Sequence, residues 1–83
     1  MKADKDKVCR LLKTARGQID GILKMIEQDR YCIDISNQVS ATEAILRKAN
    51  REILTAYMKS CVKEAFEKGN EDEKINELVE LIE

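Results

Sequence analysis

Apolar residues recur every three or four positions along most of the chain, the spacing that places them on one face of an α-helix. A first run follows a polar start over residues 1–7, and a last run occupies residues 75–82. Between them, residues 30–68 contain no glycine and no proline. The pattern predicts one all-α domain over residues 1–83, with three helices over about residues 5–28, 30–68 and 71–83.

Two short breaks separate these helices. Asp29 is the residue we expect to cap the N-terminus of the central helix. Gly69 suits a left-handed cap at the end of that helix. Gly17 and Gly21 lie inside the first helix, where each costs about 1 kcal/mol relative to alanine. We therefore expect another backbone to approach the first helix closely at these two glycines.

The central helix is too long for a compact chain of this size. At about 1.5 Å per residue it extends for roughly 55–60 Å, whereas a compact chain of this length is roughly 30 Å across. One short helix cannot cover the row that follows it, which consists of Ile35, Val39, Thr42, Leu46, Ala49, Ile53 and Cys61. The row predicts that a second copy of the same helix packs against it, in an obligate oligomer.

Two cysteines mark the ends of the central helix. Positions 32 and 61 differ by 29 residues, which at about 100° per residue places both thiols on one helix face. They are also about 43 Å apart along the helix, so they cannot meet within one chain. An antiparallel pair with its two-fold axis between Leu46 and Arg47 would bring Cys32 against Cys61 of the partner subunit. This register predicts two identical two-thiol sites.

The composition excludes several classes of protein. The chain has no histidine and no glycine-rich phosphate loop, so we do not expect an enzyme. It has no apolar run long enough to cross a membrane, which predicts a cytoplasmic protein with no membrane partner and with reduced thiols. A lone cysteine on an apolar helix face is often a small core residue, and this is the interpretation we favour for Cys9.

The net charge of −1 is not that of a typical nucleic-acid binder, but the basic residues are concentrated on the first two helices. The predicted two-fold axis brings both copies of a basic trio to the centre of the dimer, where they can contact DNA phosphates. An ordinary solvated helix surface is the alternative. The candidate DNA-binding residues are Arg10, Lys13, Arg16, Arg47, Lys48 and Arg51.

Several segments together resemble the copper-sensitive operon repressor family over nearly the whole chain. They are residues 13–22 (Lys-Thr-Ala-Arg-Gly-Gln-Ile-Asp-Gly-Ile), 29–34 (Asp-Arg-Tyr-Cys-Ile-Asp), 38–41 (Gln-Val-Ser-Ala), 48–51 (Lys-Ala-Asn-Arg) and 60–62 (Ser-Cys-Val). The resemblance implies an all-helical dimer of antiparallel long helices, assembled further into a flat, disc-shaped tetramer. It also implies a transcriptional repressor that leaves its operator DNA when an inducer reaches the cysteine site, with Tyr31, Tyr57 and Glu77 as surrounding residues.

The family divides by its ligands, and this chain departs from the copper branch. Copper(I) sensors resemble it at Cys32 and Cys61 but carry a histidine where this chain has Tyr57. The chain also has Lys2 where the formaldehyde-sensing branch has proline, and it lacks the histidines of nickel and cobalt sensors. What remains resembles the persulfide-sensing branch, in which reactive sulfur species cross-link the two cysteines between subunits.

The resulting prediction is a repressor that responds to small sulfane-sulfur inducers and uses no metal cofactor. Two alternatives stay open. One is a copper(I) sensor of the same family that binds the metal through Cys32 and Cys61 alone. The other is a helical adaptor that does not bind DNA and whose cysteines are structural.

Overall fold

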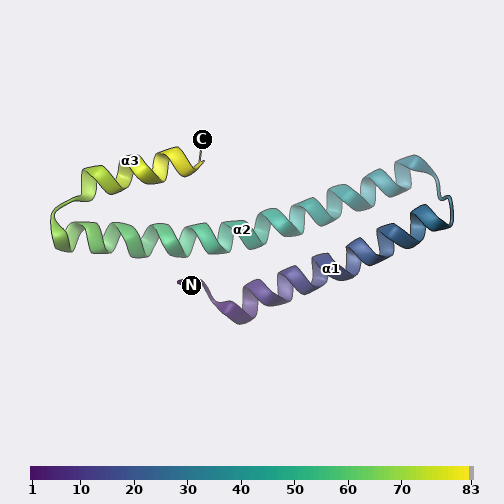
Figure 1. Cartoon of the computed structure of the whole chain (residues 1–83), viewed down its shortest axis with the longest axis horizontal. Helices are drawn as coiled ribbons and strands as arrows, with labels where there is room; N and C mark the ends of the chain where they lie inside the picture. Colours follow the sequence, from purple (N-terminus) through teal and green to yellow (C-terminus); the bar gives the residue numbers. More distant parts are fainter. Residues whose placement is uncertain (83) are drawn as a thin grey trace.

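The computed structural model describes residues 1–82 and contains three α-helices: α1 (Lys5–Glu27), α2 (Cys32–Lys68) and α3 (Glu71–Ile82). Figure 1 shows α1 and α3 on opposite sides of α2, each covering a different part of its length. The prediction of a three-helix, all-α chain is confirmed. The predicted extension of the third helix to residue 83 lies outside the described residues.

The turn between α1 and α2 differs from the prediction. α1 ends where Asp29 adopts a left-handed backbone conformation, with φ of 54°. The backbone N–H groups of Asp29 and Arg30 donate to the carbonyls of Ile26 and Met25, at 3.0 Å each. This pair of bonds is a Schellman motif. Asp29 therefore ends α1 and does not cap α2, whose N-cap is Tyr31 and which begins two residues later than predicted.

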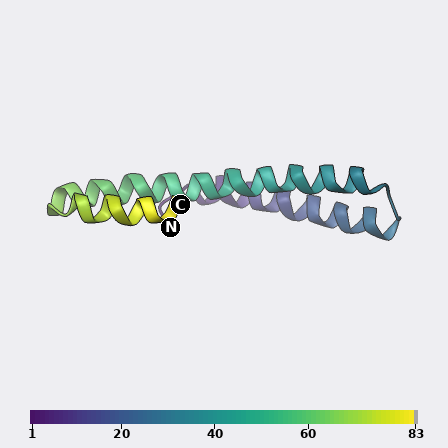
Figure 2. The same ribbon diagram turned by 90° about the horizontal axis from the view of Figure 1, so that it is seen from above.

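α2 sets the longest dimension of the molecule. The chain measures 58 × 26 × 12 Å, and its radius of gyration is 17.8 Å, against about 12 Å for a compact chain of this size. Seen from above, the helices form a thin layer (Figure 2). A single chain therefore encloses little apolar volume, as the length of the central helix predicts.

α1 packs on the N-terminal part of α2 through small side chains. Ala15 and Ala49 are each only 2% exposed, and Val8 is 4% exposed. Gly17 and Gly21 instead lie on the open side of α1. Among the described residues, no heavy atom lies within 4 Å of the position that a Cβ would take at either glycine. The buried small residues of this contact are the two alanines, so the expectation of a close approach at the glycines is wrong within this chain.

A buried polar contact fixes α1 against α2. Thr42 is 4% exposed, and its hydroxyl donates to the side-chain oxygen of Gln18 at 2.8 Å and to the carbonyl of Gln38 at 3.1 Å. The hydroxyl carries one hydrogen, which the two acceptors share. Because a buried polar group without a partner is costly, this contact holds the two helices in one register.

α3 turns back along the C-terminal part of α2. Gly69 has a left-handed conformation, with φ of 77°, and its N–H donates to the carbonyl of Ala65. This is the cap that the sequence predicts. Ala65 and Leu78 are the buried residues of this contact, which is smaller than the contact between α1 and α2.

Much of the apolar surface stays open in the single chain. α1 covers Thr42 and Ala49, but Val39 and Leu46 remain 40% and 42% exposed. Further exposed apolar side chains are Leu12, Ile19, Leu23, Ile26, Ile33, Phe66, Ile75, Val79, Leu81 and Ile82. Surface of this extent marks an interaction site. Coverage by a second copy remains a prediction.

Within residues 1–82, none of the helices combines the length and the apolar character that crossing a membrane requires.

Candidate sensing site

The two predicted sensing thiols lie far apart in the chain. Cys32 is the first residue of α2 and is exposed, whereas Cys61 is half-buried near its other end. Eight helical turns separate them, or about 43 Å. Residues 1–82 contain no group of three or more histidine, cysteine, aspartate or glutamate side chains placed to hold a metal ion. A site that uses both thiols therefore needs a second chain.

The exposed part of α2 runs between these thiols. Val39 and Leu46 follow Cys32 at intervals of seven residues, and Tyr57 lies one turn before Cys61. At about 100° per residue, all five fall within a sector of roughly 60°, between the sides that α1 and α3 cover. This face is exposed at Cys32, Val39 and Leu46 and half-buried at Tyr57 and Cys61. The predicted antiparallel pairing depends on this face.

A polar cluster surrounds Cys61, formed by residues of α2 and α3. The Lys74 ammonium lies 3.1 Å from a carboxylate oxygen of Glu77, one turn further along α3. Hydrogen bonding with the Cys61 thiol raises the pKa of the Tyr57 phenol, and the charges of Cys61 and Glu77 raise it further. Glu77 likewise raises the pKa of Lys74, with smaller contributions from Cys61 and Tyr57. These four side chains therefore form one electrostatic unit.

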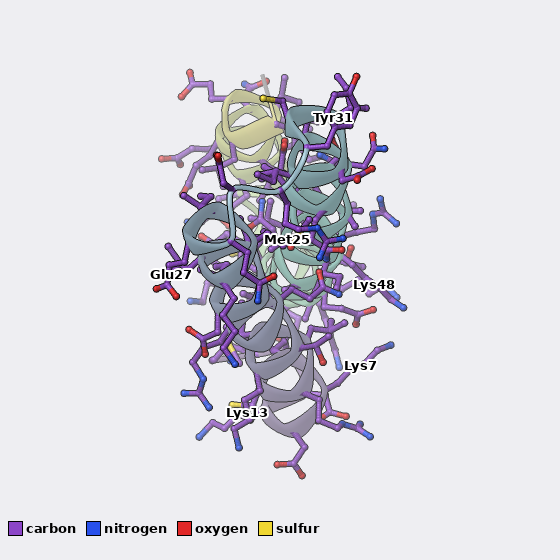
Figure 3. All side chains as sticks on the ribbon, turned by 90° about the vertical axis from the view of Figure 1, so that its right-hand side faces the viewer. Lys7, Lys13, Met25, Glu27, Tyr31 and Lys48 are labelled. Carbon is purple, nitrogen blue, oxygen red and sulfur yellow. The ribbon has the colours of Figure 1, made fainter. Side chains whose placement is uncertain are left out.

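Cys32 lies in a more exposed environment than Cys61. Tyr31, its neighbour in the turn, is 68% exposed, and Figure 3 shows its side chain pointing outward at the end of the molecule. The structure therefore brings two of the three predicted surrounding residues, Tyr57 and Glu77, to Cys61. It places Tyr31 beside Cys32, at the opposite end of α2.

The six predicted DNA-binding residues are all exposed, but they do not form one patch within a chain. Lys13 and Lys48 point away from each other in Figure 3. Arg47 and Arg51 line a shallow groove of about 310 Å³ between α2 and the end of α3. Arg47 also lies 3.9 Å from the carboxylate of Glu43. The roles of these residues remain predictions.

Sequence analysis missed one member of the cluster, Lys74. It is the single basic residue in α3, among five acidic residues between Glu71 and Ile82. That isolated positive charge in an acidic helix was the available signal. Its position beside Cys61, however, depends on how α3 packs on α2.

An all-α chain with soft thiols at both ends of a long helix has the features of a ligand-responsive regulator. A family model described as metal-sensitive transcriptional repressor matches residues 4–83. The chain belongs to this family of transcriptional repressors. The predicted family is thereby confirmed, and so is the prediction of a regulator rather than an enzyme. The persulfide-sensing branch within the family stays a prediction.

Relatives of known function are also transcriptional repressors. A copper-sensing transcriptional repressor of Mycobacterium ulcerans is 41% identical over 71 residues, which make up 86% of this chain and 61% of that protein. A copper-sensing repressor of Bacillus subtilis is 36% identical over 78 residues, or 94% of this chain and 77% of that protein. The chain therefore spans less than two thirds of the mycobacterial relative.

Solved structures share the fold. A copper-sensing repressor from Geobacillus thermodenitrificans, crystallised with Cu(I), superposes with a TM-score of 0.82 at 34% identity, covering 99% of this chain and 88% of that one. The nickel-responsive regulator InrS gives a TM-score of 0.86 at 28% identity, covering 99% and 92%. The expectation that no metal is involved is therefore wrong, because the matching family is metal-sensitive and several relatives sense copper. The absent histidine had led to that expectation.

Proposed function

We propose that this protein is a transcriptional repressor whose hold on operator DNA is released by copper(I), bound between Cys32 of one subunit and Cys61 of the partner subunit. The observation that carries the proposal is one face of α2 that joins exposed Cys32 to half-buried Cys61 and leaves apolar Val39 and Leu46 exposed between them. The copper-sensing function of the relatives supports the choice of metal.

The chemistry of the donors fits copper(I). Thiolates are soft ligands that select this ion, whereas a phenol oxygen is a poor one. Cys32 and Cys61 would hold the metal, which would supply one positive charge shared by the two thiolates. Tyr57, with its raised pKa, stays a neutral phenol at physiological pH and acts as a hydrogen-bonding neighbour rather than as a ligand.

The cluster around Cys61 supports a route from the thiol to the DNA surface. α3 packs against the part of α2 that carries Cys61. The end of α3 borders the groove that Arg47 and Arg51 line. A change of charge at Cys61 therefore acts on a helix that also borders these arginines. A differential binding energy of about 1–3 kcal/mol between the two states is enough to change operator affinity by one to two orders of magnitude.

The lack of any histidine in the chain favours a second candidate, release by reactive sulfur species. In that reaction the Cys32 thiolate attacks the outer sulfur of an organic persulfide, forming a Cys32 persulfide and releasing the organic thiolate. The Cys61 thiolate of the partner subunit then attacks the inner sulfur and expels hydrosulfide, which leaves a disulfide between the subunits. Both candidates use the same two thiols.

A complementation experiment tests whether the site is shared between subunits. Cys32→Ser and Cys61→Ser should each lose high-affinity copper(I) binding, measured anaerobically against a chromophoric chelator. Co-refolding the two variants should restore binding, because each mixed antiparallel dimer regains one site with both cysteines and loses the other. Cys9→Ser should bind like the unmodified protein. Failure of the mixture to recover any binding would contradict a shared site.

Operator release distinguishes the two inducers. With the promoter DNA upstream of its own gene as probe, the copper proposal expects release by stoichiometric copper(I) without covalent modification or cross-linking of the protein. The persulfide candidate expects release by polysulfide, together with a covalent dimer that is absent from both single serine variants. Release by polysulfide alone would overturn the copper proposal.

The DNA surface is tested by charge removal. Replacing Arg47, Lys48 and Arg51 by alanine should weaken operator binding by roughly 10-fold or more at moderate salt, and should reduce the salt dependence of the affinity, because phosphate contacts are lost. The helical content should be unchanged, since all three side chains are exposed. Full affinity in this triple variant would place the DNA contacts elsewhere.

A further inference from the structure

The shallow groove of about 310 Å³ on α2 lies where α3 ends. α3 stops part-way along α2 (Figure 1), so it does not cover the strip of α2 beyond its last residue. The volume is at the lower end of the range of small-molecule sites. Neither sensing thiol lines this groove, so it is separate from the candidate sensing site. Its lining residues are Arg47, Asn50, Arg51, Leu54, Thr55, Met58 and Ile82.

The polarity of the groove changes along its length. Arg47 and Arg51 lie one turn apart, and Leu54 and Met58 follow them at intervals of three and four residues. These four positions fall within a sector of roughly 60° of α2. Because α3 returns along α2 from residue 68, its last residue Ile82 borders the Met58 side of the groove. The groove therefore has an arginine end (Arg47 and Arg51) and an apolar end (Leu54, Met58 and Ile82).

The two ends suit the two parts of an amphipathic anion. At the apolar end, Leu54 and Met58 are half-buried and Ile82 is exposed, so an apolar chain placed there removes further apolar surface from water. At the arginine end, guanidinium groups bind a carboxylate through charge-assisted hydrogen bonds. A small polar anion would leave the apolar end uncovered, and a neutral apolar molecule would gain nothing from the arginines.

We propose that this groove binds small amphipathic carboxylates, with the carboxylate at the arginine end and the acyl chain along the apolar end. Seven residues separate Arg51 from Met58, about 10 Å along the helix, which a medium-chain acyl group spans. The binding site does not rest on the proposed function, but its consequence does. Because the arginine end belongs to the predicted DNA surface, a bound carboxylate would compete there with DNA phosphates.

Glu43 is a competitor for the arginine end within the chain itself. Its carboxylate lies 3.9 Å from the Arg47 guanidinium, and both side chains are exposed. An exposed pair of this kind contributes little free energy, so the carboxylate of a ligand can take its place. The inference therefore makes opposite predictions for the two partners: neutralising the arginines weakens binding of the ligand, and neutralising Glu43 strengthens it.

Methionine methyl groups report on the groove directly. The chain has three methionines, of which Met58 lines the groove and Met1 and Met25 do not. In the full chain labelled with ¹³C-methyl methionine, titration with octanoate below its micelle concentration should shift the Met58 signal saturably and leave the other two in place. The neutral 1-octanol, which has the same chain without the charge, should bind about three- to tenfold more weakly, the size of one to two exposed charge interactions. Acetate, which has the charge without the chain, should leave Met58 unshifted at the same concentrations.

Matched variants test the arginine end. Arg47→Gln with Arg51→Gln should weaken octanoate binding about three- to tenfold, and Glu43→Gln should strengthen it, which unfolding cannot do. Lys48→Gln with Lys59→Gln removes the same net charge from exposed positions outside the groove and should leave the affinity unchanged. High salt should reduce the differences, because it screens exposed charges.

Three results would overturn the inference. The first is a Met58 signal that does not respond to octanoate, as expected if the partner subunit covers the groove. The second is equal binding of octanoate and 1-octanol. The third is an equal loss of affinity in the arginine and the lysine double variants. Because the measurement contains neither copper nor DNA, each of these results leaves the copper proposal untouched.

Discussion

The two parts of α2 are covered in different ways. Its N-terminal part packs on α1, a helix of 23 residues, through the buried alanines Ala15 and Ala49 and the contact between Thr42 and Gln18. Its C-terminal part packs on α3, a helix of 12 residues, through Ala65 and Leu78. The first contact is long and fixed by a buried polar group. The second is short and surrounded by charged residues.

This difference assigns different tasks to the two contacts. Elements with few buried apolar contacts open at lower free energy than a well-packed core. α3 is such an element, and it carries Lys74 and Glu77 next to Cys61. We infer that the contact with α1 is the scaffold and that the contact with α3 responds to the ligand.

Overpacking gives the largest contrast between the two parts. Ala49→Leu inserts three carbons where α1 and α2 approach each other, and it should lower the free energy of unfolding by about 3 kcal/mol. Ala65→Leu, against the shorter helix, should cost about 1 kcal/mol, because α3 can shift away. Urea unfolding at one fixed protein concentration measures both, since association adds to apparent stability.

The matched pair is informative because both alanines are 2% exposed and lie on the same helix. Equal losses of stability would show that α3 is held as firmly as α1. In that case the proposed division between scaffold and responsive element would be wrong.

The next largest expected effect concerns the buried hydrogen bond between Thr42 and Gln18. Thr42→Val keeps the shape of the side chain but leaves the Gln18 oxygen without its buried donor, which should cost about 2 kcal/mol. The double variant Thr42→Val with Gln18→Met removes both partners and should recover much of this loss. Thermal unfolding of the single and double variants gives the coupling between the two residues. Independent, additive losses would mean that the hydrogen bond does not fix α1 on α2.

The sequence was sufficient for those parts of the fold that depend on neighbouring residues. Helical periodicity predicted three helices, and Gly69 ends α2 because a glycine tolerates positive φ. Asp29 was ambiguous, since aspartate suits an N-cap and also tolerates the left-handed conformation that it adopts here. Only the hydrogen bonds of the turn distinguish the two roles.

The site was less predictable because it depends on contacts between helices. The spacing of Cys32 and Cys61 shows that they share a face, since helix geometry alone determines this. Lys74 is part of the cluster only because α3 returns along α2 at one particular rotation. The missing histidine was taken to exclude a metal, although two thiolates already satisfy the preference of copper(I) for soft ligands.

Tyr57→His tests whether a third donor beside Cys61 raises the affinity for copper(I). Positions 57 and 61 lie one turn apart, so an imidazole can reach a metal bound at Cys61. The variant should bind copper(I) at least 10-fold more tightly, which corresponds to about 1.4 kcal/mol. Competition with a chelator measures this, and Tyr57→Phe is the control that removes only the hydroxyl. An unchanged affinity would place the metal away from this face of α2.

The smallest effect concerns the ion pair that ties the start of α1 to the middle of α2. The Lys7 ammonium lies 3.0 Å from a carboxylate oxygen of Glu52, and the two side chains are 46% and 34% exposed. Because water screens such a pair, Lys7→Met should change the free energy of unfolding by about 0.5 kcal/mol or less. Lys5→Met is the matched control, a nearby lysine outside this pair. Should Lys7→Met cost more than about 1 kcal/mol over the control, charge rather than packing would hold this end of the scaffold. The contrast with α3 would then rest on Ala15, Ala49 and Thr42 alone.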